Sequence, residues 1–97
     1  MKSFIKHRNL KATLVLLGLG LTHRARSDYA KAVDFLTQSR QQYAQLDRQH
    51  DVANLWDHLG RAYRLWGKFD EAITCYQEAR TRYVALGLMA EVAHVLW

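Results

Sequence analysis

Cys75 and five histidines have the side-chain chemistry for nucleophilic catalysis or metal binding. Cys75 stands in a segment of helical periodicity, where a lone thiol is usually buried and inert. The chain has no glycine-rich phosphate loop. We therefore predict no catalytic site, no metal and no cofactor, and we expect the protein not to be an enzyme. Metal sites need close, regular ligand spacing, whereas the histidines are scattered: His7, His23, His50, His58 and His94.

The alternative to an inert thiol is a dyad of Cys75 with a distant histidine. It predicts that Cys75→Ala abolishes an activity, whereas a buried thiol predicts only a small change in packing.

The basic residues concentrate at the N-terminus. The chain has a net charge of +5. Residues 1–27 hold six bases and no acid, and residues 28–97 hold eight bases and nine acids. The body of the protein is therefore close to neutral, and an electrostatic partner would be sought at the N-terminal segment. A nucleic-acid binder would have to use that arm. Because the rest of the protein has no excess of basic residues, nucleic acid is not the partner we predict.

The first 22 residues have two interpretations. "MKSFIKHRNLK" precedes "ATLVLLGLGL", the order of a charged and an apolar region in a targeting segment. Ten largely apolar residues are too few to span a bilayer, and Arg24 and Arg26 stand where a small-residue cleavage site would be. We predict a helix of the fold in a cytoplasmic protein. The alternative is a membrane-anchored or exported protein that uses residues 1–22 as its targeting segment.

The sequence repeats itself at a shift of forty residues. Leu19-Gly20 aligns with Leu59-Gly60, and Tyr43 aligns with Tyr83. Apolar residues recur at three- and four-residue steps, the period of an amphipathic helix. Such periods are typical of solenoids built from helix pairs. The pattern predicts an all-α fold with helices at about 9–25, 28–47, 50–66, 69–86 and 88–97.

The second unit carries the motif Trp56-x2-Leu59-Gly60-x2-Tyr63, followed by Ala72, Tyr76 and Ala79. It resembles the signature of the tetratricopeptide repeat. The first unit matches at Leu16, Leu19, Gly20, Ala32 and Leu36. The forty-residue period is similar to that of extended repeats in bacterial signalling and scaffold proteins.

The resemblance implies an α-solenoid of antiparallel helix pairs that binds protein and performs no chemistry. We expect one domain over residues 1–97, with a first repeat at about 12–49, a second at about 50–88 and the first helix of a third at about 89–97. Packing is the expected role of the signature aromatics Trp56, Tyr63 and Tyr76.

The resemblance also implies that the first helix of each pair lines a concave groove for a peptide or a partner helix. The implied groove residues, given below, combine leucines, an asparagine and arginines. Such a mixture suits a ligand with apolar and acidic parts. The alternatives are a solvated surface for the charged members and a covering by the N-terminal tail for the leucines. The implied groove residues are Leu14, Leu17, Leu21, Arg24, Asn54, Asp57, Arg61, Arg64 and His94, and His94 and Trp97 begin the third unit's part of the groove.

The sequence "EVAHVLW" predicts self-association. It places apolar residues on a last helix with no polar capping helix after it, and repeat arrays need such caps for solubility. We expect a homo-oligomer, or an intrachain continuation of the repeat, through Val92, Val95, Leu96 and Trp97.

Overall fold

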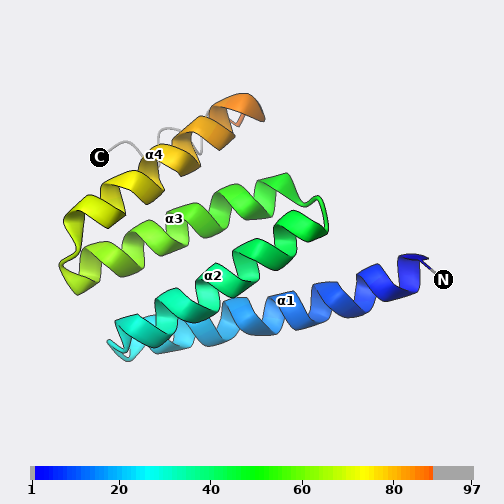
Figure 1. Cartoon of the computed structure of the whole chain (residues 1–97), viewed down its shortest axis with the longest axis horizontal. Helices are drawn as coiled ribbons and strands as arrows, with labels where there is room; N and C mark the ends of the chain where they lie inside the picture. The colour runs from blue at the N-terminus through cyan, green and yellow to red at the C-terminus, as the bar shows by residue number, and fades with distance from the viewer. Residues whose placement is uncertain (1, 89–97) are drawn as a thin grey trace.

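The protein folds into antiparallel helices that pack in chain order (Figure 1). The structure is a computed structural model that describes the backbone of residues 2–88 and the side chains of residues 9–88. The helices are α1 (Lys2–Ala25), α2 (Tyr29–Gln45), α3 (Gln49–Trp66) and α4 (Phe69–Ala85). Each helix packs against its sequence neighbour, so α1–α2 and α3–α4 form two hairpins joined through α2 and α3.

The same turn closes each of the helices that the structure describes. Four residues at twenty-residue spacing have a positive φ: Ser27 (62°), Asp47 (57°), Gly67 (85°) and Gly87 (75°). The amide of the next residue donates to a carbonyl five residues earlier, as in a Schellman motif. The forty-residue period thus contains two units of helix and turn. The four bonds are Asp28 to His23 (2.8 Å), Arg48 to Tyr43 (3.0 Å), Lys68 to Tyr63 (2.9 Å) and Leu88 to Tyr83 (2.9 Å).

A glycine brings the two helices of each hairpin together. An ideal Cβ at Gly20 would lie 2.7 Å from Leu36 Cδ2, and one at Gly60 would lie 2.7 Å from Tyr76 Cε1. Both distances are far shorter than a carbon–carbon contact allows. The two pairs are forty residues apart, so the same close approach recurs in both hairpins.

The core runs from one hairpin to the next. The buried residues Leu36, Leu55 and Leu59 belong to one cluster with contributions from α2, α3 and α4. Trp56 and Tyr63 pack against both this cluster and a second one between α3 and α4. The Arg40 guanidinium lies 4.3 Å from the centre of the Trp56 ring and adds a cation–π contact between α2 and α3. The packing role predicted for the signature aromatics is thus confirmed for these residues and for buried Tyr76.

A buried polar contact lies between α1 and α2. Ser39 Oγ donates to the Thr13 carbonyl oxygen at 3.1 Å, and Thr13 Oγ1 lies 2.9 Å from Gln42 Oε1. Thr13 and Ser39 are fully buried. Small hydroxyl side chains allow close helix approach here, and each hydroxyl finds a partner, which offsets its burial.

The predicted helices agree with the observed ones except at the N-terminus. The first helix begins at Lys2 rather than near residue 9, because nothing before Gly18 breaks a helix and lysine and arginine are good helix formers. Its Leu10, Leu17 and Leu21 pack against the core. A targeting role of residues 1–22 stays the alternative to a helix of the fold, and the division into repeats stays a prediction. The last predicted helix lies outside the described residues.

Within the described part of the chain, none of the helices combines the length and the apolar character needed to cross a membrane.

Candidate functional site: the groove of α1 and α3

One side chain links the first helices of the two hairpins. Arg24, at the end of α1, donates from Nη1 to the backbone carbonyl oxygen of His58 at 3.3 Å, and the same nitrogen lies 3.5 Å from His58 Nδ1. His58 lies in the middle of α3. The contact places the C-terminal end of α1 beside α3, where the implied groove residues of both helices meet.

The acid of the groove is already paired. Asp57 is buried and its Oδ2 lies 3.2 Å from Arg61 Nη2, one helical turn further along α3. Arg61 is half-buried and Arg64 is exposed. Because Asp57 and Arg61 neutralise each other, Arg24 and Arg64 give this part of the groove a positive excess.

Tyr76 lies near enough to these charged side chains to be perturbed by them. Its buried phenol lies on α4, behind α3. Burial raises the pKa of Tyr76, and Arg64, Asp57, Arg61 and Arg24 all perturb it electrostatically. Burial and the neighbouring Arg61 lower the pKa of the Arg24 guanidinium. Crowded like charges of this kind are relieved by an anion.

His58 contacts the implied groove residue Arg24, and the sequence analysis did not include it in the site. Burial, and then the charge of Arg24, lower its pKa to about 4. The imidazole is therefore neutral at pH 7 and keeps one nitrogen as an acceptor beside Arg24. The signal was present, because His58 follows Asn54 by four residues on the same helical face.

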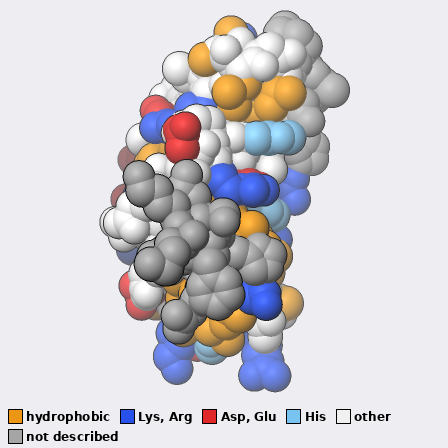
Figure 2. All heavy atoms as spheres, turned by 90° about the vertical axis from the view of Figure 1, so that its right-hand side faces the viewer, with side chains coloured by type: hydrophobic (Ala, Val, Ile, Leu, Met, Phe, Trp, Pro, Cys, Tyr) orange, Lys and Arg blue, Asp and Glu red, His pale blue; other side chains and the backbone are white. Residues whose placement is uncertain are grey.

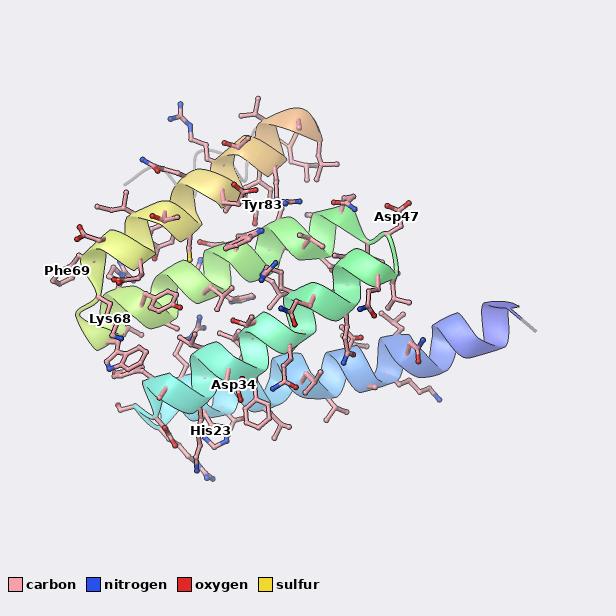
Figure 3. All side chains as sticks on the ribbon, viewed as in Figure 1. His23, Asp34, Asp47, Lys68, Phe69 and Tyr83 are labelled. Carbon is pink, nitrogen blue, oxygen red and sulfur yellow. The ribbon has the colours of Figure 1, made fainter. Side chains whose placement is uncertain are left out.

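The implied groove residues on α1 include three leucines, of which two contact the core. Leu14 is half exposed, whereas Leu17 and Leu21 are partly buried and pack against the core. The Asn54 side chain is held from behind, because Tyr83 on α4 donates to its Oδ1 at 2.6 Å. Figure 3 shows Tyr83 reaching from α4 towards α3. The structure thus brings the arginines together, and of the three predicted leucines it exposes chiefly Leu14.

A match with a known family accompanies this geometry. The model of the tetratricopeptide repeat matches residues 12–83, about three quarters of the chain. The chain belongs to the tetratricopeptide repeat family. Among curated proteins and solved structures, none matches this sequence. The matched range spans most of both hairpins, so the all-α fold and the resemblance inferred from the Trp56–Ala79 motif are confirmed.

Tetratricopeptide repeats are typically interaction modules. In this chain the Cys75 thiol has the burial and the raised pKa of a cysteine that packs in the core. Cys75 is buried, and burial raises its pKa to about 11. It lines a surface hollow with Tyr63, Asp70, Glu71 and Thr74, yet a protonated thiol is a poor nucleophile. Among the described residues no three His, Cys, Asp or Glu side chains gather closely enough to hold a metal ion.

The remaining predicted site residues of this repeat protein cannot be placed. His94 of the groove, and Val92, Val95, Leu96 and Trp97 of the predicted self-association surface, lie outside the described residues.

Proposed function

We propose that this tetratricopeptide repeat protein is a non-catalytic scaffold that binds a partner peptide or helix in the groove of α1 and α3. The family supports a protein-binding role. The convergence of Arg24, Arg61 and Arg64 on one site carries the finer proposal. Asp57 compensates Arg61, so an incoming carboxylate would pair with Arg24 or Arg64 through charge-assisted hydrogen bonds.

The apolar end of the groove gives the ligand a second feature. Leu14 and Arg24 are ten residues apart on α1, which corresponds to about 15 Å along the helix axis. An extended peptide covers that distance in about four to five residues. The proposed ligand therefore has an apolar side chain and an acidic group separated by that number of residues.

Arg64→Glu tests this proposal. Arg64 is exposed, so its reversal changes the groove charge without disturbing the buried Asp57–Arg61 pair. Proteins captured by the wild type are compared with those captured by Arg64→Glu and by the control Arg80→Glu, which reverses an exposed arginine on α4. We expect a specific partner to be lost with Arg64→Glu alone, at unchanged helicity. Equal capture by all three proteins would contradict a role for the arginines.

Self-association is a second proposed property. Val84 and Leu86 are exposed at the C-terminal end of α4, and Figure 2 shows hydrophobic side chains at the top of the molecule, where α4 ends. An apolar surface of this kind favours contact with another chain. We expect dimers or larger assemblies in sedimentation at about tens of micromolar, where a moderate interface is populated. A stable monomer at that concentration contradicts this proposal.

A further inference from the structure

The outer face of α1 carries an apolar strip that corresponds to a buried face of α3. By the forty-residue register, Val15 corresponds to Leu55 and Leu19 to Leu59. Leu55 and Leu59 are 1% and 2% exposed, whereas Val15 and Leu19 are 61% and 39% exposed. The flanking pairs behave alike, since Ala12 and Thr22 are exposed while Val52 and Ala62 are buried.

On α3 a helix covers this face. The α2 residue Leu36 is buried in the same cluster as Leu55 and Leu59, and Arg40 of α2 stacks on Trp56. The equivalent strip on α1 has no helix over it among the described elements. A Cβ at Gly18, beside the strip, would meet no atom within 4 Å. The strip therefore has the spacing and the open space that a second helix needs.

The length and chemistry of the strip match a short helical segment. From Ala12 to Thr22 it runs about 15 Å along α1. The exposed residues over this length are all uncharged: Ala12, Leu14, Val15, Gly18, Leu19 and Thr22.

Basic residues lie at both ends of the strip. Lys11 precedes it and Arg26 follows it, and both are exposed. The sequence adds Lys2, Lys6 and Arg8 in the first turns of α1, and the first 27 residues contain no acid. Figure 1 shows these first turns projecting beyond α2. In Figure 2, hydrophobic side chains lie in the lower half, where Figure 1 places α1, with basic side chains at the bottom edge.

We propose that this outer face of α1 is a second interaction surface, which binds an acidic amphipathic helix of a partner protein. The apolar strip takes the apolar face of that helix, and the bases at its ends pair with flanking acids. A second copy fits less well, because two α1 helices would bring together two basic segments that contain no acid. The surface goes beyond the proposed groove, since it depends on Val15 and Leu19 and not on Arg64.

A stapled peptide derived from α2 tests the proposal, because α2 covers the equivalent face of α3. One peptide has residues 29–45 as they stand. The other carries Lys31→Glu, Gln41→Glu and Gln45→Glu, all at exposed positions of α2. We expect the fluorescence anisotropy of the acidic peptide to report saturable binding to the full chain, at least about tenfold tighter than that of the parent peptide and weakened by salt.

Substitutions in the protein locate the contact. Val15→Asp and Leu19→Asp should each weaken binding at least about tenfold, since each buries a charge opposite an apolar side chain. Lys11→Glu should weaken the binding of the acidic peptide more than the binding of the parent peptide. The matched control is Ile73→Asp, an exposed isoleucine on α4, and Arg64→Glu is a control for the groove. Both should bind as the wild type does, and circular dichroism confirms that every variant is folded.

Four outcomes would overturn the proposal. The first is no binding of either peptide to the folded protein, and the second is equal loss with Ile73→Asp. The third is a dimer of the wild type that Val15→Asp alone dissociates, which would make the strip an interface between copies. The fourth is Val15-dependent binding to phosphatidylcholine–phosphatidylserine vesicles without peptide binding, which would make it a membrane contact. Loss of partners with Arg64→Glu bears on the groove alone, so the two proposals fail separately.

Discussion

Arg24 Nη1 lies 3.3 Å from the backbone carbonyl oxygen of His58. The two residues are 34 positions apart and belong to the first helices of different hairpins. This contact joins α1 to α3. Burial of the His58 imidazole, and then the charge of Arg24, lower its pKa and keep it neutral at pH 7. A second positive charge next to the Arg24 guanidinium, in a partly dry site, would be costly.

The His58–Arg24 contact predicts a pH-dependent stability. The folded-state pKa of His58 is lowered from 6.5 to about 4, so below pH 6.5 the unfolded chain binds a proton that the folded chain does not. Stability therefore falls as the pH drops through this window. From pH 7 to pH 5 we expect a loss of about 2 kcal/mol in the free energy of unfolding. Urea denaturation of wild type and His58→Gln at both pH values measures it, and an equal loss in the two proteins would refute the role of His58.

The close approach at Gly20 predicts opposite effects for two glycines on one helix. Gly20→Ala places a methyl group against the buried Leu36 and should lower the free energy of unfolding by about 1–3 kcal/mol. Gly18→Ala meets open space and should raise it by about 0.5–1 kcal/mol, since alanine favours a helix over glycine. Thermal and urea unfolding compare the two variants. Stabilisation by Gly20→Ala would contradict the packing described for this pair.

The repeated turn predicts that glycine is preferred where two other residues stand. Ser27 has a φ of 62°, a conformation that costs a non-glycine residue about 1 kcal/mol. Ser27→Gly should therefore raise the free energy of unfolding by about 0.5–1 kcal/mol. The matched control is Gly67→Ala at the equivalent turn, which should lower it by a similar amount. Calorimetric melting of both variants tests this, and the same sign of change in both would argue against strain at Ser27.

The hydrogen bond from Tyr83 to Asn54 predicts that the two residues contribute to stability in a coupled way. Tyr83→Phe removes the donor of the 2.6 Å bond and should cost about 1 kcal/mol. A double-mutant cycle with Asn54→Ala should give a coupling energy of about 0.5–1.5 kcal/mol. Additive effects would show that the bond does not hold Asn54. We also expect weaker ligand binding by Tyr83→Phe, because the Asn54 amide loses its fixed orientation.

The architecture could be predicted from particular residues. The Trp56–Ala79 motif and the forty-residue shift indicate helix pairs, because a helix buries one stripe and a repeat must bury the same stripe each time. The twenty-residue turn was only half visible in the sequence. Gly67 and Gly87 indicate a left-handed backbone conformation at the end of a helix. Ser27 and Asp47 adopt the same conformation, although their residue types do not indicate it.

The candidate site was less accessible to sequence reasoning. Helical register places Asn54, Asp57, Arg61 and Arg64 on one face of α3. It cannot tell which of these side chains already contact another residue of the protein. Asp57 is paired with Arg61, Asn54 is held by Tyr83, and Leu17 packs against the core. Each of these partners lies on another turn or another helix, so only the packed structure reveals which groups remain for a ligand.

The sequence by itself determined the helices, their repeat and the family, because local periodicity and the spacing of small and aromatic residues encode how a helix pair packs. The tertiary structure alone decided the state of each side chain on those helices. Val15 and Leu55 occupy equivalent positions in the repeat, yet one is exposed and the other buried. The difference arises because α2 covers α3, and burial depends on which neighbour a helix meets rather than on its own pattern.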